Sequence, residues 1–383
     1  MIFKKKLKHF VLMSTLFSIL SGISQSAFAN YSSFNFWKKF LVNPFKNFPE
    51  VVPEVAVPEV AVPEVAVPEV AVPEAKVTSI DLNNTQEGLS ETIRQQWQAI
   101  DLAGYRLTGL FERRCEVSQG QSCIQGGISG RRSKDTRGSS INLNFTQSLA
   151  KGMYFGVVLD RNLNNGVSKQ IDAKNIVPAM AFYMGWDQND NRHGWGLMTG
   201  LGYMRDRLDI QRVYKPNTEK GRGHANLRGF SFITQARYTF QMDPSLELTP
   251  YGELRYSSFK RNAYSEDTIF KTEYDELKSE KYIARAGVKL NKQLDQVFSV
   301  GIGAGADIVL SQKTSGGTSN MPELNGLSVA SKLKVPSQET KKVSAFGQAQ
   351  IQANLKNKLN MTLSGALYGS SQGELGLTFS KRW

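Results

Sequence analysis

Two cysteines carry the clearest chemistry in this chain. Cys115 and Cys123 are its only cysteines and lie eight positions apart. An exported chain passes through an oxidising compartment, so this pair predicts a disulfide that closes a short loop. Metal binding is the alternative, but a zinc site needs about four ligands and no histidine lies nearby. We therefore expect neither a metal site nor a cofactor.

Histidine is scarce, and this limits the enzymatic hypotheses. The sequence contains His9, His193 and His224. His9 lies in the leader and His193 in a short predicted turn, which leaves His224 in a long polar link. A hydrolase would place a histidine beside a serine or a carboxylate, whereas His224 is flanked by Lys220 and Arg222. We expect a protein without catalytic residues, and a hydrolase centred on His224 is the weaker alternative.

The first 29 residues have the pattern of a secretory signal peptide. Lysines at positions 4, 5, 6 and 8 precede an apolar stretch over 10–23, and Ala27-Phe28-Ala29 provides a small-residue cleavage site. Cleavage is expected between Ala29 and Asn30. An uncleaved anchor is the alternative, but the apolar stretch is shorter than the roughly 20 residues that a membrane helix needs.

The rest of the chain is predicted to have four parts. Residues 30–48 combine aromatic residues with lysines, which suits a membrane interface or a partner groove. Residues 49–76 contain the sequence VPEVA four times, and their regular prolines exclude helix and central strand. This predicts an extended stalk of about 80 Å, or a plain linker. Residues 77–103 form a linker and helix, and residues 104–383 form a barrel.

The predicted helix comes just before the barrel. Leu89–Ile100 lacks proline, and Ser90 is its candidate N-cap. Its face is largely polar, so the helix cannot lie in lipid. It suits a hydrated barrel lumen, although an ordinary surface or periplasmic helix has a similar composition.

Residues 104–383 alternate between apolar and polar side chains, with the period of two that strands have. The mean hydropathy of −0.34 is atypical of helical membrane proteins but fits a barrel, in which every second residue faces lipid. The sequence therefore predicts an all-β fold, a twelve-stranded antiparallel outer-membrane barrel. The twelve strands are expected at about 105–111, 141–145, 153–159, 180–186, 195–203, 230–240, 246–256, 282–290, 298–310, 345–355, 359–367 and 374–383.

The faces opposite the apolar ones are polar and carry charges of both signs. This favours a membrane barrel with internal ion pairs over a soluble barrel, which would bury its apolar face. Glycines at 196, 200, 202, 301, 303 and 305 would thin the inner wall, as suits an occupied lumen. The positions predicted to face inward are Arg106, Thr108, Glu112, Asn142, Asn144, Asp160, Gln235, Arg237, Glu253, Arg255, Arg285, Lys289, Asp307, Gln348, Gln350, Gln352 and Asn354.

Short and long links alternate between the predicted strands. The short ones lie near 150–152, 189–194, 243–245, 293–296 and 356–358, and the long ones near 115–138, 161–173, 215–226, 261–274 and 313–337, with a tight last link near 370. Outer-membrane barrels have short periplasmic turns and longer outer loops. The first strand is therefore expected to begin, and the last strand to end, on the periplasmic side. The formal net charge of +13 suggests outer loops that meet lipopolysaccharide or a host polyanion rather than nucleic acid.

The last strand has the most specific pattern. Leu375, Leu377, Phe379 and Trp383 share one face. An apolar face that ends on a terminal aromatic resembles the last strand of bacterial outer-membrane barrels, which the barrel assembly machinery recognises. Phe379 and Trp383 are thus the candidate assembly signal, and Trp383 is expected to pair with the strand near Tyr105.

The chain from about Thr85 to its end resembles the C-terminal translocator domain of autotransporters. Supporting stretches are 248–256, 284–288 and 301–307. The resemblance implies a helix in the pore and an N-terminal passenger displayed outside, although residues 30–84 are much shorter than the usual β-helical passenger. It implies surface display or adhesion, with outer-membrane lipid and lipopolysaccharide, the barrel assembly machinery and a host surface or matrix ligand as partners. A pore for small solutes, with a periplasmic N-terminal tether or plug, is the alternative.

Some members of that family cut their passenger free at an asparagine pair inside the pore. Asn83 and Asn84 are adjacent and precede the predicted helix, so the resemblance implies a possible cleavage site there. A solvated linker is the alternative.

Overall fold

The computed structural model describes residues 80–383, except 134–135, 150–151, 164–166, 191, 324–326, 331–342, 356–357 and 370–371. The predicted signal peptide, its cleavage site at Ala29 and Asn30, the aromatic segment and the stalk therefore lie outside the described residues. The described residues belong to one compact unit.

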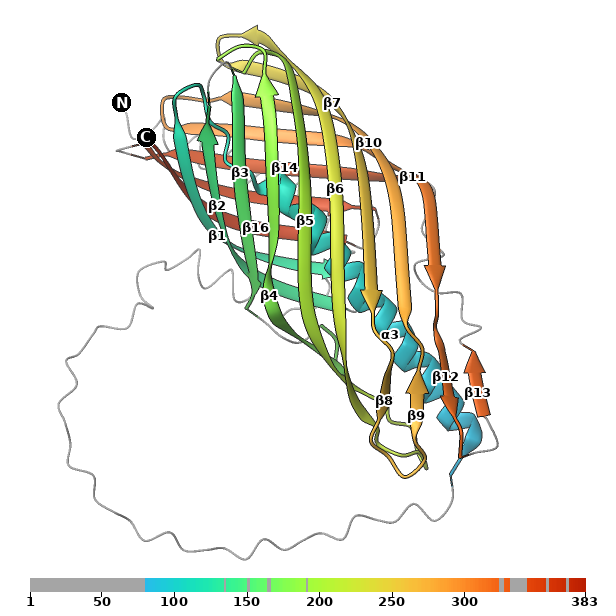
Figure 1. Ribbon diagram of the computed structural model, residues 1–383. Coiled ribbons are helices and arrows are strands. Elements are labelled where there is room, and N and C mark those ends of the chain that lie inside the picture. The colour runs from blue at the N-terminus through green and yellow to red at the C-terminus, as the bar shows by residue number, and fades with distance from the viewer. Residues whose placement is uncertain are drawn as a thin grey trace, which may run out of the picture. The chain divides into compact units, whose positions relative to one another are not determined.

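Twelve antiparallel strands form a closed barrel, in which each strand is hydrogen-bonded to the barrel strand that comes next in the chain. The last strand pairs with the first, with Cys123 opposite Arg382. Figure 1 shows this barrel with helix α3 (Leu82–Gly109) inside it. The barrel strands are β1 (Ser122–Ser133), β2 (Thr136–Ser148), β3 (Met153–Asn162), β4 (Ile171–Asp187), β5 (Gly194–Gln211), β6 (Arg222–Asp243), β7 (Leu246–Arg261), β10 (Leu277–Gln293), β11 (Phe298–Ser315), β14 (Val343–Asn354), β15 (Leu359–Tyr368) and β16 (Gln372–Arg382).

The outer and inner faces predicted for the strands from β2 onward are confirmed. Apolar side chains cover the outside, where Phe182 and Trp195 are each 53% exposed. Polar side chains of the same strands are buried in the lumen, as Asn142 and Arg255 illustrate. An apolar exterior around a polar interior is the arrangement that a barrel in lipid requires.

The predicted first strand at 105–111 is wrong, because helix α3 continues through these residues to Gly109. A short 3-10 helix, η1 (Leu110–Arg113), follows it. The first strand is instead β1, inside the segment predicted as the first long loop. Trp383 therefore pairs with Ser122, its amide nitrogen 3.1 Å from the Ser122 carbonyl oxygen, and not with a strand near Tyr105.

Helix α3 is longer than predicted at both ends. Its N-cap is Asp81 rather than Ser90, and the Asp81 carboxylate accepts a hydrogen bond of 3.0 Å from the Asn84 amide. This satisfies one of the free amides at a helix start. Among the described residues no helix is long and apolar enough to cross a membrane.

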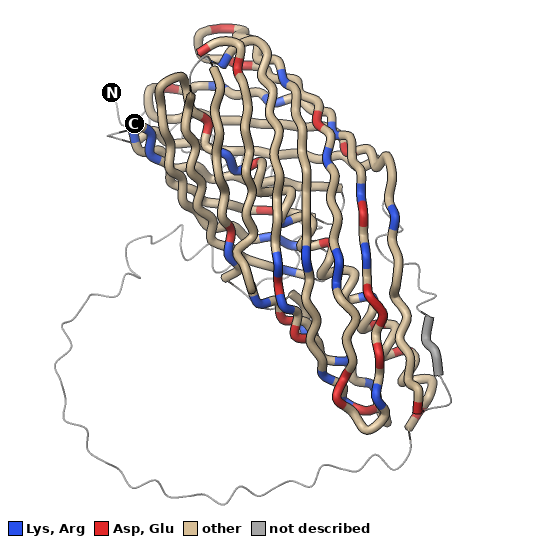
Figure 2. The backbone as a smooth tube through the Cα atoms, viewed as in Figure 1, with Lys and Arg blue, Asp and Glu red and all other residues tan. Residues whose placement is uncertain are grey.

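The two ends of the barrel differ in their links. One end carries only tight connections, and we call it the short-turn end; the start of β1 and the end of β16 also lie there. At the opposite, long-loop end, β8 (Tyr264–Glu266), β9 (Thr272–Tyr274), β12 (Thr318–Met321) and β13 (Leu327–Ala330) form a small separate sheet within two links that were predicted as plain loops. Figure 2 shows many charged residues at this end.

Strict alternation of short and long links fails at two positions at the long-loop end, because the β15–β16 link at 369–371 is as tight as predicted and the β1–β2 link is short as well. The β1–β2 link at the long-loop end spans only residues 134–135. Elsewhere the barrel strands β4 to β11 extend well beyond the 9–11 residues that cross a membrane, and β6 alone has 22 residues. The extra length builds a wall around the first half of α3.

Candidate functional site in the barrel lumen

The first half of α3 is held in an apolar core at the long-loop end. Leu89, Ile93 and Trp97 are fully buried in a cluster that also contains Leu277 and Tyr274. Burying one large apolar side chain contributes about 1.5–3 kcal/mol to the stability of the fold. The helix is therefore fixed where the strands extend past the membrane.

Polar contacts fix the beginning of the helix to the link between β5 and β6. The Asp81 amide donates to the Asn217 carbonyl at 3.0 Å, and the Val213 amide donates to the Thr92 hydroxyl at 3.0 Å. Lys215 lies 2.7 Å from the Glu87 carboxylate. The helix thus starts at the long-loop end.

A buried ion pair braces the same end. Arg212 donates to the Glu266 carboxylate at 2.7 Å and to the Thr272 hydroxyl at 2.5 Å. Burial raises the pKa of Glu266 even though Arg212 lies beside it. Burial also lowers the pKa of Arg261 to about 10, and its guanidinium lies 5.1 Å from the ring of Tyr264. It still carries its charge at neutral pH.

Asp160 on β3 is the centre of the first ion-pair network in the lumen. Its carboxylate accepts hydrogen bonds from Arg106 of α3 at 2.5 Å and from Arg113 of η1 at 3.1 Å. Arg106 also reaches Asp206 of β5 at 3.3 Å. Arg113 pairs in addition with Glu374 of β16. The helix is therefore joined by charge to strands far apart in the barrel.

Glu112 is the centre of a second network at the end of the helix. Its carboxylate accepts hydrogen bonds from Arg255 at 2.8 Å, from Arg285 at 2.6 Å and from the Tyr368 hydroxyl at 2.5 Å. Arg285 also pairs with Asp307 at 2.5 Å. The predicted internal ion pairs are thus present, and Arg106 and Glu112 do face the lumen, but from the helix side rather than from a strand.

The glycine prediction is half confirmed. A Cβ on Gly200 would meet Phe111, and one on Gly202 would approach Leu107 at 3.2 Å, so these β5 glycines make room for the helix. On β11 the neighbours are strand side chains, such as Gln350 beside Gly301. The thin wall accommodates the helix on one side only.

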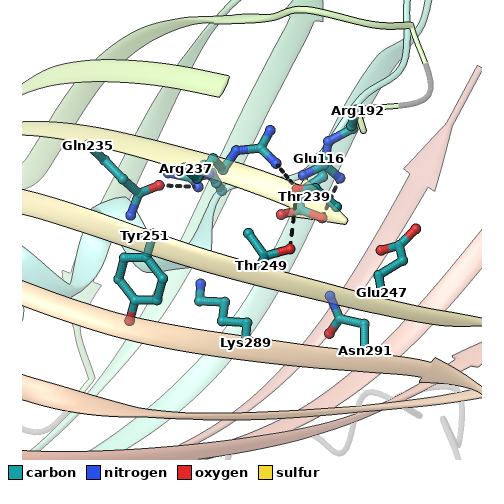
Figure 3. A pocket seen from close by; sticks show the side chains of 11 residues that line it. Glu116, Arg192, Gln235, Arg237, Thr239, Glu247, Thr249, Tyr251, Lys289 and Asn291 are labelled. Carbon is teal, nitrogen blue, oxygen red and sulfur yellow. Dashed lines mark hydrogen bonds and ion pairs between the residues drawn. The ribbon is translucent and has the colours of Figure 1, made fainter. Parts of the chain in front are cut away.

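A polar pocket lies between the helix end and the short turns (Figure 3). Four cationic side chains line it, together with Glu116 and Glu247. Arg192 pairs with Glu116 at 2.5 Å, and Arg237 pairs with Asp187 at 2.5 Å. The lining residues are Arg114, Glu116, Arg192, Gln235, Arg237, Thr239, Glu247, Thr249, Tyr251, Lys289 and Asn291.

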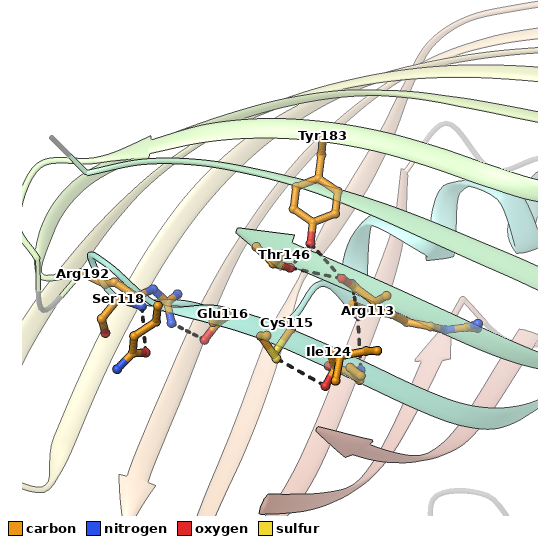
Figure 4. Close-up of a disulfide and its surroundings, with 12 residues drawn as sticks. Arg113, Cys115, Glu116, Ser118, Ile124, Thr146, Tyr183 and Arg192 are labelled. Carbon is orange, nitrogen blue, oxygen red and sulfur yellow. Dashed lines mark hydrogen bonds and ion pairs between the residues drawn. A yellow bond between two sulfur atoms is a disulfide. The ribbon is translucent and has the colours of Figure 1, made fainter. Parts of the chain in front are cut away.

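The disulfide between Cys115 and Cys123 lies beside this pocket, with Cα atoms 6.2 Å apart (Figure 4). Both cysteines are buried. The bond is not in an outer loop, where the sequence placed it, because Cys123 belongs to β1 and Cys115 follows η1. We call α3 and η1 together, residues 82–113, the plug. The disulfide ties the segment just after the plug to the first strand at the short-turn end.

The other predicted site residues are scattered. Asn83 and Asn84 form the first turn of α3 at the long-loop end, where the Asn84 side chain donates to the Pro216 carbonyl at 2.9 Å; cleavage there stays a prediction. His224 lies in β6 rather than in a loop, opposite Asp209, whose carboxylate is held by lysine and arginine neighbours. His193 lies in a short turn, 3.3 Å from Glu247.

The described residues contain no group of three or more His, Cys, Asp or Glu side chains that could hold a metal ion. The partners of Asp160 and Glu112 were missed by the sequence reasoning. A signal existed in the helical spacing of Ile100, Ala103, Leu107 and Phe111, which continues the buried face of α3 past its predicted end.

A closed twelve-stranded antiparallel barrel with an apolar exterior and a helix in its polar lumen is an outer-membrane β-barrel. Residues 125–366 match the model of the autotransporter beta-domain family. The chain belongs to this family, which locates it in the outer membrane of a Gram-negative bacterium.

One of the solved structures that the chain resembles shares this fold. The translocator domain of the autotransporter NalP from Neisseria meningitidis overlaps with a TM-score of 0.55 at 16% identity, covering 75% of this chain and 96% of that chain. The beta domain of the Bordetella autotransporter BrkA gives 0.45 at 11% identity, over 69% and 99%. The toluene transporter TbuX of Ralstonia pickettii gives 0.42 at 9% identity, over 70% and 90%. No curated protein matches the sequence.

Proposed function

We propose that this protein displays a short N-terminal segment at the cell surface, with a role in adhesion or surface interaction. The observation that carries this is the direction of α3. The helix starts at the long-loop end, beside Asn217, and its end leads to β1 at the short-turn end. The chain upstream of residue 80 is therefore joined to the barrel at the long-loop end.

The expected orientation of the barrel in the membrane places the start of the helix, and the chain upstream of it, on the outer side. Outer-membrane barrels keep short turns in the periplasm and longer loops outside, so the long-loop end is the outer end. The aromatic and basic residues 30–48 and the repeat at 49–76 would then meet a host surface or a matrix ligand. Lys38, Lys39 and Lys46 suit an anionic partner.

The second candidate function is a pore for small solutes, in which the segment upstream of residue 80 is a periplasmic tether or blocks the lumen. The filled lumen argues for a nearly closed barrel, because Trp97, Leu107 and Phe111 of the plug are buried. Single-channel recordings in planar bilayers separate the two functions. A low open fraction that rises only when residues 82–113 are removed fits display, whereas steady conductance of the intact chain fits the pore.

Protease treatment of intact cells tests display directly. We would insert the same cleavable epitope after Ala75, within 331–342, or between Pro244 and Ser245. The first two should be cut and the third, in a short turn, protected. If the epitope after Ala75 is protected while the one within 331–342 is cut, display through the barrel is wrong.

We also propose that Phe379 and Trp383 form the signal that the barrel assembly machinery reads. Both side chains are on the outer face, 46% and 52% exposed, so they are accessible without unfolding the lumen. Replacing either with Ala should lower the amount of barrel in the outer membrane, while Lys381→Ala on the same face should not. Equal membrane levels for all three variants would contradict this role.

A further inference from the structure

A row of four cations crosses the outside of the barrel near the long-loop end. Arg205 of β5 is opposite Arg228 of β6, which is opposite Lys260 of β7, which in turn is opposite Lys278 of β10. We call these four residues the cationic row. Figure 2 shows lysine and arginine on neighbouring strands in this part of the sheet. Like charges directly opposite one another destabilise a sheet, so this arrangement calls for an anion.

The cationic row lies immediately beyond the aromatic residues that mark the edge of the lipid-facing band. Tyr203, Phe230 and Tyr282 are exposed on the same face, one or two outward positions nearer the membrane. On β5 the outward aromatics Trp195 and Tyr203 are eight residues apart, about 27 Å along the strand. With the usual tilt this corresponds to roughly 20 Å of height, close to the apolar band of such barrels. The row is therefore at the level of lipid head groups.

The local carboxylates do not neutralise the row. Glu276 pairs with both Lys260 and Lys278, and hydrogen bonds from these lysines lower its pKa. Glu280 lies beside Lys278 but is opposite another cation of β11. Even counting both, four cations face two carboxylates.

The arginine half of the row is the least compensated. The Arg205 Nε atom is buried without a hydrogen-bond partner, and Arg228 makes no ion pair with any residue that the structure describes. On the same face of β5, Asp209 is already held by Lys174 and Arg207. Adjacent guanidiniums on neighbouring strands lie close enough, about 5 Å at their Cβ atoms, to share the oxygens of one phosphate group.

We propose that the cationic row binds the phosphate groups of lipopolysaccharide in the outer leaflet. One phosphate lies between Arg205 and Arg228, and a second lies against Lys260 and Lys278. The proposal rests on the orientation that places the long-loop end outside, but it is independent of what the N-terminal segment does. A free anion would not need an aromatic row beneath it, whereas a phosphorylated lipid places its chains there.

The test compares three forms of the full-length mature protein in neutral detergent. The first is wild type, the second combines Arg205→Gln with Arg228→Gln, and the control combines Lys174→Gln with Arg222→Gln. The control removes the same charge from the same outer face, farther from the aromatic residues. Each form is titrated with lipid A carrying two phosphates, with dephosphorylated lipid A, and with inorganic phosphate, and binding is measured by native mass spectrometry.

Wild type and control should bind the phosphorylated lipid equally, and the row variant should bind it at least about tenfold more weakly, which is about 1.4 kcal/mol. Dephosphorylated lipid should not distinguish the three forms. Without lipid, the row variant should unfold at the same temperature as wild type or higher, because repulsion is relieved. Equal binding of phosphorylated lipid by the row variant overturns the proposal. So does inorganic phosphate that binds wild type as tightly as the lipid.

Discussion

Replacing Arg106 with Ala removes the cation that joins the middle of the plug to two strands. Its guanidinium contacts Asp160 at 2.5 Å and Asp206 at 3.3 Å, and it is 4% exposed. Breaking a buried pair by removing one partner costs about 3 to 5 kcal/mol. Asp160 keeps Arg113 and Ser140 as partners, so we expect the lower end. A loss of about 3 kcal/mol shifts an equilibrium by about 100-fold.

Two assays follow this perturbation. The free energy of unfolding is obtained from urea titrations in detergent, and the open fraction is obtained from planar bilayers, where a loosened plug should open more often. Arg106→Lys should be intermediate, because it keeps the charge but loses the planar fork.

The matched control is Arg94→Ala on the same helix. Arg94 pairs with Glu91 and is 30% exposed, and such pairs contribute about 0–1 kcal/mol. If Arg106→Ala destabilises the protein no more than Arg94→Ala and leaves the open fraction unchanged, the lumen network does not hold the plug, and the reasoning is refuted.

Two further predictions concern packing and covalent linkage. Gly156→Ala should destabilise the barrel by about 1–3 kcal/mol, because a Cβ there would overlap the ring of Tyr183, whereas Gly252→Ala meets nothing within 4 Å and should be neutral; urea unfolding of both variants checks this, and equal midpoints would contradict it. Replacing Cys115 and Cys123 with Ser should lower the free energy of unfolding by about 2–3 kcal/mol for a loop of this length. Adding reductant to wild type should reproduce this loss, whereas the same reductant should not change the stability of the double Ser variant, which is the control.

The strand pattern could be predicted because lipid imposes it. A residue on the outer face must be apolar and its neighbours must suit the lumen, so alternation is strong wherever both solvents act on a strand. β1 escapes this rule. Its outward positions include Gly126 and Gly130, which are small rather than apolar, and Ile124 and Ile128 are too few to form a visible pattern.

The sequence predicted the first strand at 105–111 instead of at β1, and this error has a physical cause. Tyr105, Leu107 and Phe111 fit a period of two over a short window, but Leu107 and Phe111 also fit the helical spacing that starts at Leu89. Short apolar runs satisfy both periods. Only the length of the helix, which is stabilised by the extended strands around it, decides between them.

The polar character of the lumen could be predicted, but its pairing could not. Alternation identified Asp160, Arg255 and Arg285 as inward residues. Which cation meets which carboxylate depends on the register of the strands and on the rotation of the helix, and neither follows from residue types. Arg106 and Glu112 illustrate this, since their inward orientation was right although their element was wrong.

The plug is held at its two ends by different means. Release of the N-terminal segment and opening of the barrel are therefore separate events. At the long-loop end, hydrogen bonds to the β5–β6 link fix the start of the helix. At the short-turn end, the disulfide to β1 fixes the segment after it covalently. A cut between Asn83 and Asn84 would free everything upstream but would leave the networks of Asp160 and Glu112 intact. Release of the N-terminal segment therefore does not require an open barrel, and opening the barrel does not require its release.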